Sequence, residues 1–194
     1  MTEIIDDLIP TINVNKIENI LLSHDFPWYL NKCVVDKSLQ YESFLKDKKT
    51  VDSIQFTHIF FSNDCIKSNL FHLVEPFSFL LKKHTGKDHP SKLLRVKANL
   101  LTKNELYPDD CYNYPHTDSN SIPGESLLYY VNQSDGDTFL FNEKRGTNFD
   151  DLTLNRRISP KKGSCLYFDS DYFHASSCPK NSDVRVVINF LYAK

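Results

Sequence analysis

The chain has 194 residues, of which 40% are hydrophobic and 25% are charged, as in globular proteins and unlike disordered or fibrous ones. Its formal net charge of −2 offers no excess of basic residues for nucleic acid or an anionic membrane, and no run reaches the roughly 18 apolar residues of a membrane helix. Because the acidic N-terminus lacks signal-peptide features and the five cysteines form no CxxC pair, we expect a cytoplasmic protein with reduced thiols and neither a nucleic-acid nor a membrane partner.

Helical patterns occupy the first part of the chain. Apolar residues recur at helical spacing over 14–22 and again over 67–83. Pro76 lies inside the second pattern, so it predicts either a kink or a late start of that helix. Residues 54–61, between the two patterns, are predicted to form a strand.

From residue 93 onward the pattern is almost entirely that of β-strands. Short segments rich in β-branched and aromatic residues alternate with Gly, Pro, Asn and Asp turns, as in a sandwich or jelly roll. Helices followed by strands predict an α+β, mainly β, fold with the N-terminal helices packed on one sheet. We expect one structural domain, with residues 1–92 as an extension packed on a core of residues 93–194. The predicted strands are 93–102, 126–132, 137–142, 153–159, 163–169, 173–178 and 184–192.

A His-x-Asp pair lies between the first two of these strands, in the sequence Tyr-Pro-His-Thr-Asp of residues 114–118. Residues two apart in an extended segment point to the same side, so His116 and Asp118 can reach one ion. Alone the pair is weak evidence, because such pairs also occur in surface turns.

His174 follows the predicted strand 163–169 and a tight turn, so it can point toward the same place. Its alternative is an ordinary buried, hydrogen-bonded histidine. Two imidazoles and one carboxylate on one face of octahedral Fe(II) leave three positions open, which is the arrangement of non-heme iron oxygenases. The sequence therefore predicts that His116, Asp118 and His174 bind Fe(II).

A buried cation is predicted in the last strand, where Arg185 lies within an apolar run. A charge there is costly unless an anion satisfies it, and a guanidinium suits a carboxylate through two parallel hydrogen bonds. Asn189 faces the same side, and Tyr130 brings a phenol from a neighbouring strand. The alternative is an internal pair between Arg185 and an aspartate.

This combination resembles the 2-oxoglutarate- and Fe(II)-dependent oxygenases, most closely the prolyl-4-hydroxylase-like branch, over roughly residues 93–193. The resemblance implies a double-stranded β-helix, a jelly roll, in which His116, Asp118 and His174 bind the metal. It also implies that Arg185 holds the distal carboxylate of 2-oxoglutarate, with Tyr130 as its partner and Asn189 nearby. The stretches that carry the resemblance are 114–118, 128–132, 136–141, 160–163 with Phe168, 173–175 and 185–189.

Two positions depart from the family's pattern. Relatives often have a tyrosine on the strand before the His-x-Asp pair, where this chain has Asn99, which we expect to take over a contact with the cosubstrate. Relatives also tend to have a second glycine after the tyrosine strand, where this chain has Asp137, which either narrows the site or faces solvent.

The resemblance implies an enzyme that uses O2 to hydroxylate an unactivated C–H bond while 2-oxoglutarate becomes succinate and CO2. Asp118 favours hydroxylation over halogenation, because halogenating relatives need that position vacated. By analogy alone, the substrate is peptidyl or free proline; otherwise the partner is an unknown peptide or small molecule. The alternatives are a noncatalytic β-helix binding module and a cupin-type metal enzyme, and the lack of a His-x-His sequence weighs against the cupin.

Overall fold

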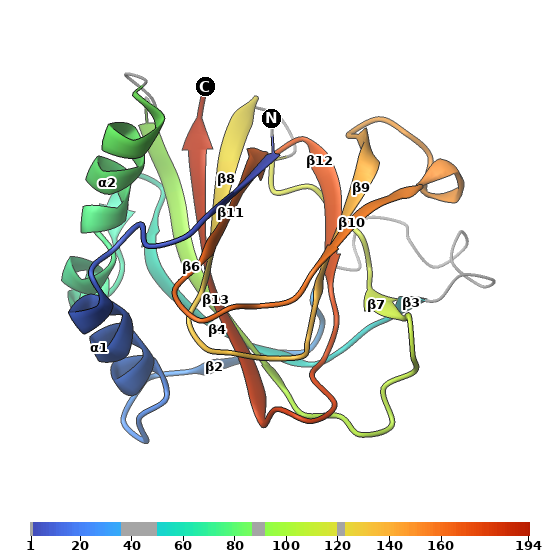
Figure 1. Cartoon of the computed structure of the whole chain (residues 1–194), viewed down its shortest axis with the longest axis horizontal. Helices are drawn as coiled ribbons and strands as arrows, with labels where there is room; N and C mark the ends of the chain where they lie inside the picture. Colours follow the sequence, from blue (N-terminus) through green and yellow to red (C-terminus); the bar gives the residue numbers. More distant parts are fainter. Residues whose placement is uncertain (1, 36–49, 87–91, 120–122) are drawn as a thin grey trace.

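The computed structural model describes residues 2–35, 50–86, 92–119 and 123–194. Two antiparallel sheets face one another, and both α-helices of the described chain lie on the outer side of the larger sheet (Figure 1). The larger sheet has eight strands. In spatial order they are β1 (Thr2–Ile5), β11 (Cys165–Asp169), β8 (Gly124–Tyr130), β13 (Val184–Ala193), β6 (Lys92–Thr102), β4 (Gln55–Ser62) and β2 (Tyr29–Asn31), and β5 (Cys65–Ile66) pairs with β4.

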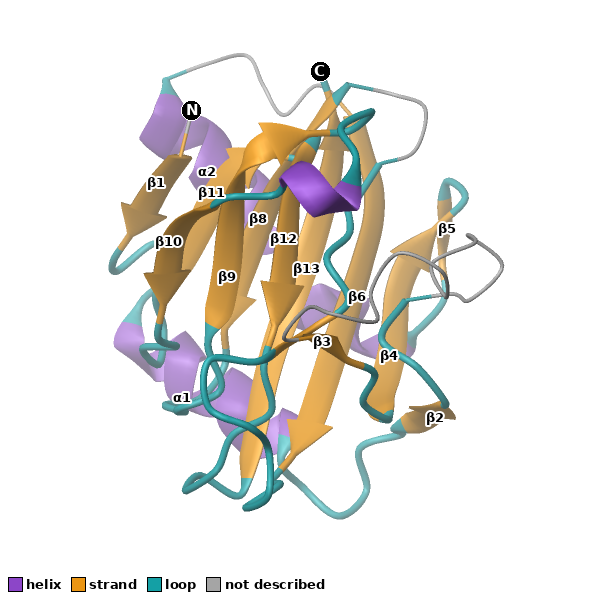
Figure 2. Ribbon diagram, turned by 90° about the vertical axis from the view of Figure 1, so that its right-hand side faces the viewer, coloured by secondary structure: helices purple, strands orange, loops and turns teal. Residues whose placement is uncertain are grey.

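The smaller sheet consists of β10 (Leu154–Ile158), β9 (Thr138–Lys144) and β12 (Tyr172–Ser176), in that order, which lie beside one another in front of the larger sheet (Figure 2). Beyond β12, an isolated bridge joins His116 to His174. The segment that carries the His-x-Asp pair thus continues the smaller sheet. Just before it, β7 (Tyr112–Asn113) pairs in parallel with β3 (Thr50–Val51).

The second predicted helix, over 67–83, is divided in two. A 3-10 helix covers Asn69–Leu73, and α2 (Pro76–Thr85) begins at the proline. Proline suits a first helical position, because its missing N–H would have no partner there, and this explains the late start. The helix ends at Gly86, whose φ of +64° is in the left-handed region that glycine adopts freely.

The main hydrophobic core lies between the helices and the larger sheet. Helix α1 (Thr11–Leu21), predicted over 14–22, buries one apolar face there beside α2. Because side chains alternate along a strand, every second residue of β8 and β13 faces this core, and the others face the smaller sheet. The buried core residues include Val14, Ile17 and Leu21 of α1, Phe77 and Leu81 of α2, and Leu127, Tyr129, Val186, Ile188 and Phe190 of the sheet.

A mainly β fold with large antiparallel sheets and few helices is confirmed. All the strands predicted after residue 92 are present, and their ends differ from the predicted ones by at most two residues. The sequence missed β1, β2, β3, β5 and β7, which are two to four residues long and too short to show alternation. The larger sheet combines strands from both parts of the chain. Strands β1, β2, β4 and β5 come before residue 92, and β6, β8, β11 and β13 come from the part that begins there.

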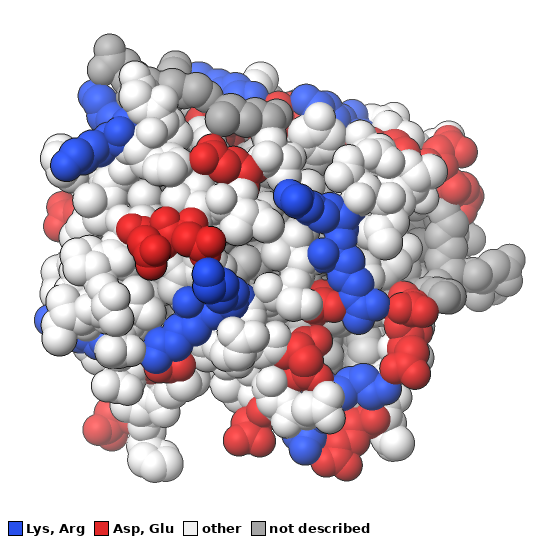
Figure 3. All heavy atoms as spheres, in the orientation of Figure 1, with Lys and Arg blue, Asp and Glu red and all other residues white. Residues whose placement is uncertain are grey.

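In the described residues, no helix is both long and apolar enough to cross a bilayer. On the face drawn in Figure 3, acidic and basic side chains are interspersed over the surface.

Candidate functional site

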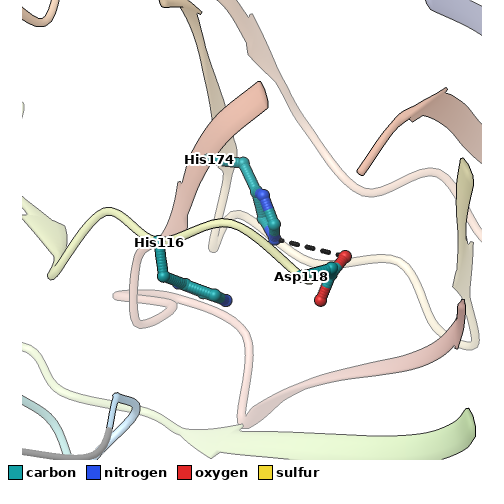
Figure 4. A group of neighbouring side chains, drawn as sticks. All are labelled: His116, Asp118 and His174. Atoms are coloured by element: carbon teal, nitrogen blue, oxygen red, sulfur yellow. Dashed lines mark ion pairs between the residues drawn. The ribbon is translucent and has the colours of Figure 1, made fainter. Parts of the chain in front are cut away.

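The three predicted metal ligands lie together between the two sheets. One ligand atom from each of His116, Asp118 and His174 lies within 4.8 Å of the others. The backbones of the two histidines exchange a pair of hydrogen bonds of 2.9 Å each, which fixes their spacing. Figure 4 shows the two imidazoles and the carboxylate converging on one point.

Both imidazole rings are oriented by backbone carbonyl groups. Nδ1 of His116 lies 3.3 Å from the carbonyl oxygen of Tyr114, and Nδ1 of His174 lies 3.3 Å from that of Tyr172. When Nδ1 donates its proton to a carbonyl, Nε2 keeps its lone pair for a metal, and such partners are typical of metal-binding histidines. His174 Nε2 lies 3.7 Å from Oδ2 of Asp118.

The carboxylate of Asp118 is buried and accepts hydrogen bonds at both oxygens. Arg95 Nη2 donates to Oδ1 over 3.0 Å, while Ser126 Oγ and Asn189 Nδ2 donate to Oδ2 over 2.6 and 2.9 Å. Burial alone would raise the pKa of Asp118, but His174, Arg95, His116 and the Ser126 hydroxyl together hold that pKa well below its usual range. The group is therefore ionised at neutral pH.

His116 is neutral at the same pH. Burial, and after it the neighbouring His174, lowers the pKa of His116 to about 3. An ionised carboxylate beside a neutral imidazole is the protonation state in which these groups bind a cation.

The triad opens onto a cavity of about 350 Å³ between the sheets. Its walls come from β6, β8 and β13 of the larger sheet, from β9 and β12 of the smaller one, and from the segment between β2 and β4. Its lining residues include all three triad members and three further predicted residues, Asn99, Arg185 and Asn189.

Arg185 is buried, with only 3% of its surface exposed, yet it has no ion pair among the described residues. Its Nε donates to the carbonyl oxygen of Gly136 over 2.8 Å, and its Nη2 donates to Oγ1 of Thr138 over 2.8 Å. The alternative of an internal Arg–Asp pair is thus not what the structure contains. Both partners are neutral, so the positive charge has no counter-ion from the described chain.

Gly136 allows Arg185 to lie where it does. A Cβ atom at this position would come within 2.9 Å of the Cδ atom of Arg185 and within 2.7 Å of the Ser177 carbonyl oxygen. A side chain at residue 136 would therefore push the guanidinium out of its place.

Tyr130 reaches Arg185 through Thr138, a residue that the sequence analysis did not single out. The Tyr130 hydroxyl donates to Thr138 Oγ1 over 3.0 Å, and burial raises the pKa of this phenol to about 12, so it stays protonated. Thr138 Oγ1 thus accepts from both Tyr130 and Arg185, and its own proton has no acceptor within the described ranges. Thr138 lies within the stretch 136–141 that carries the resemblance, but nothing in that stretch assigns it a role.

The remaining predicted residues have distinct surroundings. Asn99 lines the cavity, and its buried Oδ1 has no hydrogen-bond partner in the described part of the chain. The side-chain amide of Asn189 donates to Asp118 of the triad, whereas the resemblance implied a place near the distal carboxylate of 2-oxoglutarate. Asp137 neither narrows the cavity nor faces solvent, because it is buried, pairs with Arg157 and accepts from the Ser159 hydroxyl over 2.7 Å.

Two cavity-lining cations were missed by the sequence analysis. Arg95 and Lys97 alternate on β6 with Val96 and Ala98, which face the main core. Burial, and after it Arg95, lowers the pKa of Lys97 to about 8. Charged residues at alternate positions of an otherwise apolar strand are a signal in the sequence, and this signal would have found both.

The sequence matches no protein-family model, and no curated protein is similar to it. Solved structures are similar in fold. An oxidoreductase of the 2OG-Fe(II) oxygenase family from Burkholderia pseudomallei has a TM-score of 0.65 at 10% identity, covering 99% of this chain and 84% of that one. A prolyl hydroxylase from Trichoplax adhaerens, solved with a peptide of hypoxia inducible factor, has a TM-score of 0.61 at 11% identity, covering 99% and 83%.

A third similar structure is the epimerase SnoN with Fe3+, alpha ketoglutarate and nogalamycin RO, with a TM-score of 0.54 at 10% identity, covering 100% of this chain and 78% of that one. At such identities the similarity shows the fold alone. The chain has the fold of 2OG-Fe(II) oxygenases, including prolyl hydroxylases, which confirms the similarity predicted from the motifs.

Proposed function

We propose that the protein is an Fe(II)- and 2-oxoglutarate-dependent dioxygenase that hydroxylates an unactivated C–H bond. Its two facing sheets would then be a double-stranded β-helix, with residues 93–194 as the catalytic core and residues 1–92 as an extension. One observation carries the proposal. Arg185 is a buried guanidinium without a counter-ion among the described residues, and it lines the same cavity as a triad of metal-binding side chains.

The unpaired guanidinium supports an anionic ligand that is absent from the chain itself. A buried charge without a partner typically costs several kcal/mol, so such a residue is retained where a ligand supplies the partner. The distal carboxylate of 2-oxoglutarate would fit the free edge of Arg185. Thr138 supports the same site, since its unused hydroxyl proton can be donated to that carboxylate.

The triad fits a divalent metal that prefers nitrogen and oxygen ligands. His116, Asp118 and His174 would hold Fe(II) through two neutral imidazoles and one ionised carboxylate, and would leave other positions free for the cosubstrate and O2. When bound, the iron with 2-oxoglutarate and O2 supplies the oxidising chemistry, and 2-oxoglutarate ends as succinate and CO2.

The chain's own residues would orient these groups and exclude water. Ser126 and Asn189 fix the Asp118 carboxylate from one side, and Arg95 fixes it from the other. Between the triad and Arg185, the cavity is lined by Val187 and Asn99, which lie opposite one another on β13 and β6. The buried Oδ1 of Asn99 has no partner in the described chain, so we assign it a contact with the bound cosubstrate or its water.

Both a prolyl hydroxylase and an epimerase share this fold, so the fold does not choose between these reactions. Hydroxylation is favoured by the Asp118 carboxylate in the triad. Peptidyl or free proline remains the first substrate to try.

Anaerobic titration of the apo-protein with Fe(II) and then 2-oxoglutarate tests the proposal. We expect the weak visible absorption band of the metal chelate to appear in the wild type and to vanish in His174→Ala. Lys67→Gln, at an exposed lysine outside the cavity lining, is the matched control and should keep the band. If the wild type binds neither iron nor 2-oxoglutarate, the noncatalytic binding module replaces the enzyme.

A further inference from the structure

Strand β6 presents a positively charged face to the cavity. Arg95, Lys97, Asn99 and Leu101 all line it, while the residues between them face the opposite side of the sheet. A lysine ammonium inside a cavity is costly to bury, so its presence requires an explanation. The function proposed above uses Arg185 and the triad, and it assigns no role to Lys97.

The pairing of β6 with β13 locates Lys97 relative to Arg185. Leu101 lies opposite Arg185, Asn99 opposite Val187, and Lys97 opposite Asn189. Lys97 is therefore level with the side chain that fixes Asp118, at the triad end of the cavity. Asn189 lies four residues after Arg185 on the strand, a distance of about 13 Å along the backbone. A 2-oxoglutarate molecule bound between the triad and Arg185 would therefore extend away from Arg95 and Lys97.

The two cations on β6 are not equivalent. Arg95 pairs with Asp118 over 3.0 Å, and 31% of its side chain is exposed. Lys97 has no hydrogen bond and no ion pair anywhere in the described ranges. Lys97 is thus the cation that is free to bind a ligand, and Arg95 lies next to it on the same face of the strand.

The charges of the cavity also call for a second anion. Its described lining holds three permanently or mainly cationic side chains, Arg95, Lys97 and Arg185, against one carboxylate, that of Asp118. A divalent metal and the dianion 2-oxoglutarate would cancel each other's charge. The loaded cavity would keep a net charge of +2, and because Arg95 pairs with Asp118, Lys97 is the cationic side chain that would have no anionic partner.

We propose that Lys97, with Arg95 beside it, binds an acidic group of the primary substrate at the triad end of the cavity. This inference rests on the proposed function and narrows its substrate to a compound that carries a carboxylate close to the C–H bond that reacts. The carboxylate belongs either to a free small acid, such as an amino acid, or to an acidic side chain in a peptide. A neutral internal proline of a peptide would leave Lys97 unpaired.

Acetate, the smallest alkyl carboxylate, probes the site directly. The protein is loaded with Mn(II), which is paramagnetic, and with saturating 2-oxoglutarate, and the relaxation of the acetate methyl protons is measured. We expect enhanced relaxation in the wild type and in Lys97→Arg. We expect about tenfold weaker acetate binding in Lys97→Gln, because a charge-assisted contact is lost, and no change in the control Lys67→Gln.

The outcomes separate the inference from the function on which it rests. Equal acetate binding in the wild type and Lys97→Gln would overturn the inference while the enzyme assignment stands. So would a loss of 2-oxoglutarate affinity in Lys97→Gln as large as in Arg185→Gln, because Lys97 would then belong to the cosubstrate site. Failure of the wild type to bind Mn(II) and 2-oxoglutarate would overturn both.

Succinate release then distinguishes the two sources of the carboxylate. Free amino acids, beginning with L-proline, are compared with their primary amides and with blocked peptides that contain or lack one glutamate. Stimulation by the acids but not by the amides points to a small acid, and stimulation by the glutamate peptide alone points to an acidic peptide. Equal stimulation by an amide or by the neutral peptide would contradict the inference.

Discussion

The two faces of β6 and β13 differ in chemistry although they belong to the same strands. On the outer face, Val96, Ala98, Val186, Ile188 and Phe190 pack beneath the helices in a continuous apolar core. On the inner face, the same strands carry Arg95, Lys97, Asn99, Arg185 and Asn189 into the cavity. The outer face buries apolar surface. The inner face buries charged groups and amides that lack some of their ionic or hydrogen-bond partners.

This difference assigns stability to one face and ligand binding to the other. Burial of apolar side chains is favourable without any ligand, whereas a buried unpaired cation lowers stability until an anion arrives. Substitutions on the outer face should therefore change folding, and substitutions on the inner face should change binding. The following predictions test that division, beginning with the largest effect.

Phe190→Ala should destabilise the fold by about 3–5 kcal/mol, because it removes a fully buried ring. The ring of Phe190 stacks on Phe77 with centroids 4.9 Å apart, so the cavity left behind lies between sheet and helix. Chemical denaturation measures the change. Leu154→Ala, at a residue that is 52% exposed, is the control and should stay within about 0.5 kcal/mol. Equal effects of the two substitutions would contradict the division.

Asp118→Ala should abolish tight metal binding and also lower the unfolding free energy by about 1–3 kcal/mol, because buried donors lose their acceptor. The donors concerned are the Ser126 hydroxyl, the Asn189 amide and the partly exposed guanidinium of Arg95. Calorimetric titration with Mn(II) and denaturation of the same sample measure the two effects. Retention of wild-type metal affinity would show that Asp118 has only a structural role.

Thr138→Val should weaken 2-oxoglutarate binding about tenfold, because Arg185 and Tyr130 lose the oxygen that they share and the ligand loses a donor. Valine has nearly the same shape, so the unfolding free energy should fall by only about 1 kcal/mol. Thr138→Ser keeps the hydroxyl and should keep most of the affinity. A large loss in the serine variant would point to packing by the methyl group instead.

Asp135→Asn should give the smallest effect. It should lower the unfolding free energy by about 1 kcal/mol or less at neutral pH. Asp135 accepts backbone hydrogen bonds from Lys180, Asn181 and Ser182, which precede β13 and its Arg185. Burial opposes ionisation, but these hydrogen bonds hold the pKa of Asp135 well below its usual range.

A depressed pKa in the folded state means that ionised Asp135 stabilises the fold above its unfolded pKa of about 3.9 and loses this effect as the pH falls below that value. The difference in unfolding free energy between wild type and Asp135→Asn should therefore be constant near neutrality and shrink below about pH 4. A difference that does not depend on pH would contradict this role of the carboxylate.

The sequence predicts the strands that build the cavity, because β6 and β13 are long enough for alternation to be visible. It also predicts the triad, since His116, Asp118 and His174, with Arg185 after them, follow a spacing shared with a known family. It does not predict β1 or β2, whose pairing depends on contacts distant in sequence. Thr138 is missed for the same reason, because its role depends on Tyr130 and Arg185 meeting in space.

The most direct test of whether Arg185 binds a carboxylate compares two ligands of the Mn(II)-loaded protein. The affinity for 2-oxoglutarate is measured beside the affinity for 2-oxopentanoate. The second compound carries a methyl group in place of the distal carboxylate. We predict that 2-oxoglutarate binds about 10–100 times more tightly to the wild type, and that this advantage disappears in Arg185→Gln. Equal affinities of the two compounds for the wild type, or an advantage that survives in Arg185→Gln, would contradict the account.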